Sequence, residues 1–95
     1  MNIEWSDEAL ADLSSLHTFV AKDNPVAAQK LATAIVTSVK KNLPDNPHMG
    51  RPGRVNGTRE LVVSNTSYIV PYRIKSGIIQ ILRVYHGARR WPEIL

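Results

Sequence analysis

Residues 57–92 of this 95-residue chain read GTRELVVSNTSYIVPYRIKSGIIQILRVYHGARRWP, and they carry the clearest signals of its fold. This stretch contains three short runs rich in Val, Ile and Tyr, separated by the turn formers Ser, Asn and Gly. Runs of this kind are typical of consecutive antiparallel strands. The pattern predicts strands at Thr58–Ser64, Ser67–Lys75 and Ile78–His86.

The turn at Ser76-Gly77 predicts how the last two strands pair, because a two-residue hairpin turn fixes the register of its strands. This register pairs Ile74 with Ile79, Tyr72 with Ile81, Val70 with Arg83 and Tyr68 with Tyr85. A turn one residue longer would instead bring Arg73 to the face of Arg83 and Tyr85. Pro71 predicts either a missing ladder bond or a bulge in the middle strand, since proline has no N–H.

The register also predicts two different faces of the sheet. The paired residues form one mostly apolar face, which we expect the helices to cover. The opposite face combines apolar side chains with polar ones, and we expect it to stay partly open. An amphipathic partner segment suits such a face. The residues expected on this second face of the sheet are Ile69, Pro71, Arg73, Lys75, Ile78, Gln80, Leu82, Val84 and His86.

The first half of the chain predicts a short strand at Asn2–Trp5 and then two helices. Ser6 is suited to an N-cap, and apolar residues recur at helical spacing across residues 7–22. Asn24-Pro25 suits the start of a second helix, since Asn is a good N-cap and Pro fits the first helical position. We expect the two helices to form a hairpin over one face of the sheet. The second helix carries the apolar stripe Ala28, Leu31, Ala32, Ile35, Val39 and Leu43.

The segment Pro44–Gly57 predicts a loop, since its prolines, glycines, Asn and Asp oppose regular structure. A loop this long in a small domain is either functional or a simple spacer. The expected fold class is therefore α+β. It has a helical hairpin on one face of a small, mainly antiparallel sheet of three to four strands, and residues 1–95 form a single domain.

Charge is distributed unevenly along the chain. Residues 1–50 hold four lysines against six acids, whereas residues 51–95 hold seven arginines and one lysine against two acids. Such asymmetry indicates an acidic partner, either nucleic acid or an acidic protein segment, although a solvated basic surface would show the same pattern.

Composition excludes several classes of site. The chain has no cysteine, which rules out disulfides, thiolate metal sites and a thiol nucleophile. The three histidines are scattered and no glycine-rich phosphate loop precedes a helix, so we expect no metal and no cofactor. The N-terminus lacks signal-peptide features and no apolar run approaches the ~20 residues that span a bilayer. We therefore expect a cytoplasmic protein that does not insert in a membrane.

Two helices, a Pro/Gly loop and the motifs that follow together resemble the RelE/ParE superfamily of type II toxin–antitoxin toxins, over essentially the whole chain and most specifically in its C-terminal half. The resemblance rests on Gly57-Thr58-Arg59-Glu60, on Tyr68 to Arg73, and on Leu82-Arg83-Val84-Tyr85-His86-Gly87-Ala88-Arg89-Arg90. It implies a toxin that arrests growth, contributes to plasmid stabilisation, and is neutralised by an acidic antitoxin encoded beside it. Two targets are known in the superfamily. ParE-like members inhibit DNA gyrase by binding it, and RelE-like members cut messenger RNA on the ribosome.

The residues favour the ParE-like branch. In RelE-like nucleases an arginine of the middle strand holds the scissile phosphate, and that position is Ile69 here. A C-terminal tyrosine of some nucleases is replaced by Gly87. RNA cleavage remains the alternative, and the resemblance would then imply catalytic roles for Glu60, His86 and Arg89. His86 matches a histidine of one RNase branch, and Glu60 and Arg89 lie near an acid and a C-terminal arginine of that branch.

Five arginines are the candidates for contact with a target or an antitoxin. Arg89 and Arg90 are the strongest, because they are adjacent and flank Trp91, which we expect to pin the tail to the domain. Arg59 could instead simply form cross-strand ion pairs, and Arg73 could be an ordinary solvent-facing strand residue. The complete binding set is Arg59, Arg73, Arg83, Arg89 and Arg90.

Overall fold

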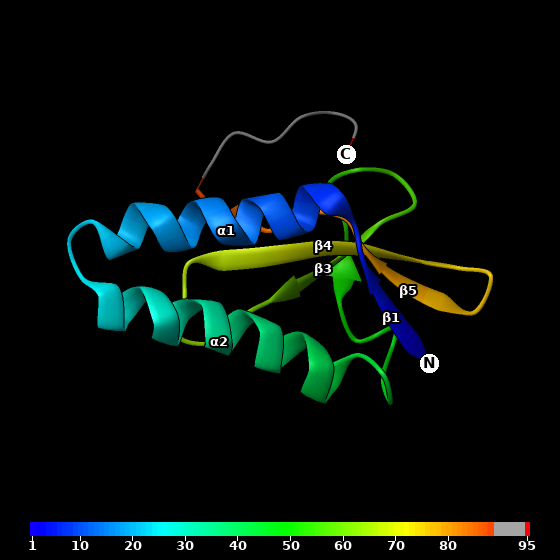
Figure 1. The fold of residues 1–95 in the computed structure, drawn as a ribbon. Coiled ribbons are helices and arrows are strands. Elements are labelled where there is room, and N and C mark those ends of the chain that lie inside the picture. The colour runs from blue at the N-terminus through cyan, green and yellow to red at the C-terminus, as the bar shows by residue number, and fades with distance from the viewer. Residues whose placement is uncertain (89–94) are drawn as a thin grey trace.

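Two helices and six strands make up the fold in a computed structural model, which describes residues 1–88 and 95 (Figure 1). Both helices precede all but one of the strands. In chain order the elements are β1 (Asn2–Trp5), α1 (Asp7–Ala21), α2 (Pro25–Asn42), β2 (Arg51–Pro52), β3 (Arg59–Val62), β4 (Tyr68–Lys75), β5 (Ile78–Ile81) and β6 (Tyr85–His86).

Both helices begin at the residues that the sequence predicts. The Ser6 side chain accepts a hydrogen bond from the Ala9 N–H, and the Asn24 side chain accepts one from the Ala27 N–H. These bonds satisfy N–H groups that have no partner inside the helix. Only a short turn separates α1 from α2, so the helices run antiparallel as a hairpin (Figure 1).

The sheet has the order β1-β5-β4-β3-β2, with β6 paired to β4 beyond the end of β5. The pairing of β1 with β5 is parallel, and every other pairing is antiparallel. The α+β class is confirmed, and the sheet is larger than expected. Part of the difference lies in the loop: Arg51 and Pro52 form a two-residue strand on β3, although the composition of Pro44–Gly57 predicts no regular structure.

The hairpin register is confirmed near the turn and wrong beyond it. Ser76 and Gly77 both have positive φ, as a type I′ turn requires, and Ile74 pairs with Ile79. After Ile81 the strand is interrupted, because the N–H groups of Leu82 and Arg83 both donate to the Pro71 carbonyl, at 2.9 and 3.4 Å. The extra residue shifts the pairing by one, so Tyr68 faces His86 and Ile69 faces Tyr85.

This bulge lies opposite Pro71, where the sequence predicts an irregularity. In an antiparallel strand the N–H and C=O of one residue point to the same neighbouring strand. The Pro71 carbonyl points to the bulge, so an N–H at this position would also have pointed there, and proline has none. The structure also corrects the predicted surroundings of two residues. Val84 is buried in the core on the helix side, and Ile69 is only 7% exposed, so neither belongs to an open apolar patch.

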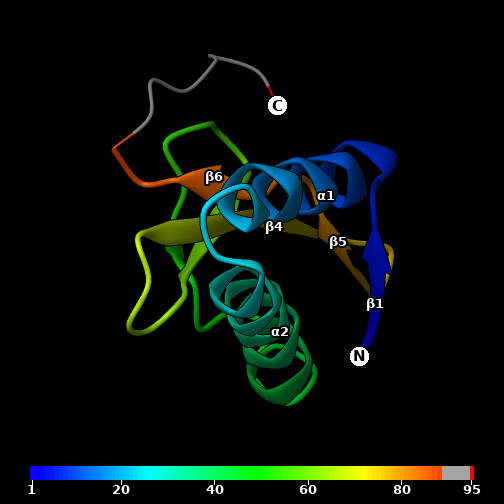
Figure 2. The ribbon, with the colours of Figure 1, turned by 60° about the vertical axis from the view of Figure 1, so that its left-hand side comes forward.

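The core lies between the helical hairpin and one face of the sheet (Figures 1 and 2). Its members from the helical half are Ala9, Leu16, Ile35, Val39 and Leu43, the last of which directly follows α2. Its members from the sheet and its connections are Leu61, Val63, Val70, Tyr72, Ile79, Ile81 and Val84. Within the described part of the chain, no helix is long and apolar enough to cross a membrane.

Candidate functional site

Glu60 is a buried carboxylate held by two arginines. Its side chain is 1% exposed. Oε1 accepts from Nε and Nη2 of Arg51, at 3.1 and 3.0 Å, and Oε2 accepts from the backbone N–H of Arg54 at 2.7 Å. The Arg54 side chain lies 3.8 Å from Oε2 and reaches the Gly87 carbonyl. Because a buried charge needs such partners, Glu60 anchors the 51–58 loop to β3.

His86 is exposed at the end of β6. Its ring meets the ring of Tyr68 edge-on, with centroids 5.4 Å apart, and Nδ1 accepts from the Ala88 N–H. A small cavity of about 220 Å³ lies beside it, lined from α1 by Asp12, Ser15, Leu16 and Phe19. His86 therefore lies on the helix side of the sheet. Over residues 1–88 and 95, no group of three His, Asp or Glu side chains could hold a metal ion.

The strand pairing separates these two candidate catalytic residues. Glu60 pairs with Pro71 and His86 pairs with Tyr68, and these two residues of β4 are three positions apart. Paired residues share a face, and positions an odd number apart point to opposite faces. Glu60 and His86 therefore lie on opposite faces of the sheet. The third candidate, Arg89, lies outside the described residues.

Three of the candidate binding arginines have partners inside the protein. Arg59 donates from Nη1 to the carbonyls of His48 and Gly50, at 3.0 and 2.8 Å. Arg73 is exposed and donates from Nε to Gln80 Oε1 at 2.6 Å, across β4 and β5. These two residues support the 48–50 loop and the hairpin respectively, and Arg73 is the more accessible to a partner.

Arg83 forms a bidentate ion pair with Asp12 of α1. Nε lies 2.7 Å from Oδ2 and Nη2 lies 2.9 Å from Oδ1. These bonds raise the pKa of Arg83 above its already high ordinary value. The guanidinium carbon also lies 4.7 Å from the centroid of the Tyr85 ring, within cation–π range. Arg89, Arg90 and Trp91 lie outside the described residues.

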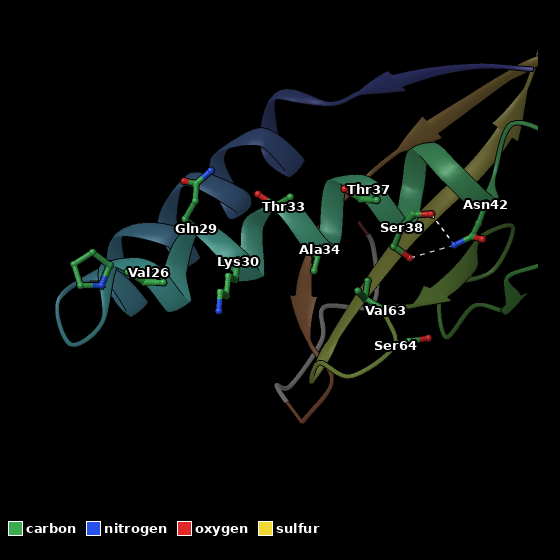
Figure 3. A pocket seen from close by; sticks show the side chains of 11 residues that line it. Val26, Gln29, Lys30, Thr33, Ala34, Thr37, Ser38, Asn42, Val63 and Ser64 are labelled. Carbon is green, nitrogen blue, oxygen red and sulfur yellow. Dashed lines mark hydrogen bonds between the residues drawn. The ribbon is translucent and has the colours of Figure 1, made fainter.

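A groove beside α2 has a volume of about 800 Å³ (Figure 3). One side is the outer face of α2, and the other is formed by Val63 and Ser64, which follow β3. Its lining is mostly small or apolar, and comprises Pro25, Val26, Gln29, Lys30, Thr33, Ala34, Thr37, Ser38, Asn42, Val63 and Ser64.

The sequence motifs do not predict this groove, although the charges and the small outward-facing residues of α2 are a signal for it. The only charged residues of α2 are Lys30, Lys40 and Lys41, so the helix has three positive charges and no acid. Its outward face has small residues at helical spacing, including Thr33, Ala34 and Thr37, where a solvated helix usually has mixed charges. Val26 is 65% exposed at one end of the groove.

Residues 3–91 match the family described as the ParE toxin of the type II toxin–antitoxin system, parDE. The match spans both helices and the sheet. The protein is therefore a type II toxin of the RelE/ParE superfamily. Within that superfamily it belongs to the ParE toxin family. Y4kP of Sinorhizobium fredii, described as a candidate toxin, is 42% identical over 93 residues, which cover 98% of this chain and 95% of Y4kP.

Two solved structures share the fold. The chromosomal ParDE toxin–antitoxin system from P. aeruginosa gives a TM-score of 0.80 at 35% identity, over 90% of this chain and 95% of that one. The toxin–antitoxin complex RelBE2 from Mycobacterium tuberculosis gives a TM-score of 0.65 at 26% identity, with the same shares covered. Both similar structures come from toxin–antitoxin systems, which supports an antitoxin as a partner of this chain.

Proposed function

We propose that this toxin arrests growth by binding DNA gyrase in the cytoplasm, and that a neighbour-encoded acidic antitoxin neutralises it. The observation that carries the proposal is the separation of Glu60 and His86 by the sheet. RNA cleavage needs an acid, a base and a phosphate-holding cation around one 2′-hydroxyl. A toxin that acts by binding needs no such group.

The surroundings of Glu60 support the same choice. Both carboxylate oxygens already accept hydrogen bonds from Arg51 or Arg54, and the side chain is 1% exposed. A proton-transfer group must reach its substrate at hydrogen-bond distance. Ile69, at the position of the phosphate-holding arginine of RelE-like toxins, is itself buried. The proposed contacts with gyrase fall on Arg89 and Arg90, supported by the exposed Arg73.

The groove beside α2 is the proposed antitoxin site. It follows one face of a helix of 18 residues, about 27 Å long at 1.5 Å per residue, which suits a partner helix. The apolar lining would accept the apolar face of that helix. Lys30 lies in the lining, with Lys40 and Lys41 further along α2, so acidic residues at the edge of the partner would complement it.

Cleavage of messenger RNA is the second candidate, favoured by the similarity to RelBE2 and by the exposed His86. One paired experiment separates the two functions. Purified toxin is added to gyrase in a supercoiling assay and, in parallel, to a translated message analysed by primer extension. We expect loss of supercoiling with an intact message. Message cleavage with unaffected gyrase would overturn the proposal and return Glu60, His86 and Arg89 to catalytic roles.

A further inference from the structure

The interruption between β5 and β6 is closed by a side chain of α1. Within the bulge, the N–H groups of Leu82 and Arg83 share the Pro71 carbonyl. The next N–H, that of Val84, donates to Oδ2 of Asp12 at 2.9 Å. Val84 is 3% exposed, so its N–H needs a partner inside the protein. A helix carboxylate supplies the acceptor that the strand ladder does not.

Asp12 makes three hydrogen bonds to this segment. Oδ2 accepts from the Val84 N–H and from Nε of Arg83, and Oδ1 accepts from Nη2 of Arg83. The Asp12 side chain is 13% exposed, which makes these charge-assisted bonds stronger than they would be in water. Arg83 in turn packs on the ring of Tyr85. One carboxylate therefore holds the residues that lead into β6.

A second register is available to β6. The Ser76-Gly77 turn alone would continue the β4–β5 pairing and place Tyr85 opposite Tyr68, whereas the structure places Tyr85 opposite Ile69. A slip of one residue moves every side chain to the other face. The alternative register would expel Val84 from the core and turn His86 away from α1.

We propose that Asp12 is the positioning residue that selects the observed register of β6. Its three bonds are made in the register that accommodates the extra residue at the bulge, so the carboxylate stabilises this register against the one that the turn favours. The register decides on which face Tyr85 and His86 lie and where Gly87 and Ala88 leave the sheet. The functional consequence rests on the proposed function, because Arg89 and Arg90 follow these residues in the sequence.

NMR spectroscopy of the full chain tests the register directly. In the wild type we expect contacts between Tyr85 and Ile69, and slow exchange of the Val84 amide. In Asp12→Ala we expect the Tyr85–Ile69 contacts to be lost and the Val84 amide to exchange about 10- to 100-fold faster, as the loss of a charge-assisted bond implies. Asp23→Ala is the control, because it removes an equal charge from the exposed turn between the helices.

Asp12→Asn decides the question if Asp12→Ala does not fold, because Asn keeps an acceptor for Val84 and loses the charge that holds Arg83. We expect a weakened set of Tyr85–Ile69 contacts in that variant. Unchanged contacts and unchanged Val84 exchange in both variants would overturn the proposal. Gyrase supercoiling is measured alongside, and we expect inhibition to be lost in Asp12→Ala and retained in Asp23→Ala. If the wild type leaves gyrase unaffected, the proposed function fails, and the NMR contacts still decide the role of Asp12.

Discussion

Glu60 and His86 are held on opposite faces of one sheet, by the pairing of Glu60 with Pro71 and of His86 with Tyr68. Glu60 contacts the 51–58 loop through Arg51 and Arg54, whereas His86 faces the cavity beside α1. The two residues are therefore expected to respond differently to substitution. Loss of Glu60 should affect stability, and loss of His86 should affect little.

Glu60→Gln should lower the free energy of unfolding by about 2–4 kcal/mol, because two arginines lose the charge that they surround in a buried site. Thermal melting measures this loss, and Glu4→Gln on the exposed edge of β1 is the control. At a temperature where the variant is folded, we expect gyrase inhibition to persist. A variant of full stability that has lost its toxicity would contradict the structural role.

His86→Gln should leave growth arrest nearly unchanged at matched expression, since a protein that acts by binding moves no proton. Removal of a general base from a nuclease would cost about 10²–10⁴-fold in rate. Primer extension on a translated message, with wild type and variant side by side, distinguishes the two outcomes. Ile69→Arg should confer no cleavage by itself, because Ile69 is buried and the acid and the histidine remain on opposite faces.

Replacement of Arg89 and Arg90 by Ala should abolish toxicity and leave the melting temperature unchanged. Exposed charges contribute about 0–1 kcal/mol to stability but steer and hold charged partners. Circular dichroism and melting are compared with growth arrest. The substitution of Lys22 and Lys75 by Ala is the matched control, because it removes the same charge from exposed sites elsewhere. Full toxicity of the Arg89/Arg90 variant would remove these residues from the proposed gyrase contact.

Lys30→Glu should weaken binding of the protein encoded by the neighbouring reading frame by at least about tenfold, because it places a negative charge in the groove proposed for an acidic helix. Lys22→Glu is the control, because it makes the same charge change at an exposed position at the end of α1, outside the groove lining. Calorimetric titration of both variants gives the comparison, and growth rescue follows it in cells. Equal effects of the two substitutions would argue for general charge attraction and against the α2 groove.

Tyr72 makes stability dependent on pH at the alkaline end. Burial raises the pKa of its hydroxyl above the usual 10.0. The hydroxyl donates to the Pro47 carbonyl and accepts from the Gly50 N–H. As pH rises past 10, the unfolded chain loses this proton while the folded protein keeps it, so stability should fall from there up to the folded pKa. Urea unfolding between pH 8.5 and 11 should show this fall in the wild type, and a smaller one in Tyr72→Phe.

The helices and the hairpin turn were predictable because their signals are local. Ser6 and Asn24 cap helices through atoms three residues away, and Ser76-Gly77 sets its turn within four residues. The register of β6 was not predictable from local signals, because it depends on Asp12, which lies 71 residues before Arg83 in the chain. Continuing the hairpin pattern therefore assigned Val84 and His86 to the wrong face.

The candidate site was harder to predict for the same reason. Glu60 has the residue type of a catalytic acid, and only its contacts with Arg51 and Arg54 identify it as an anchor of the loop. The α2 groove combines one helix face with Val63 and Ser64 of another segment, so no single stretch of sequence contains it.

The parallel pairing of β1 with β5 has a consequence for synthesis on the ribosome. β1 is made before the other elements, and its partner among the described residues is β5. The residues that follow these two strands, Ser6 and Leu82, are hydrogen-bonded to each other and lie 76 residues apart in the chain. At 5–20 residues per second, the N-terminal strand waits roughly 4–15 s for that partner. β5 lies between β1 and β4, and β6, which is made after it, pairs with β4. The sheet of a nascent chain therefore stays incomplete until both β5 and β6 have been made.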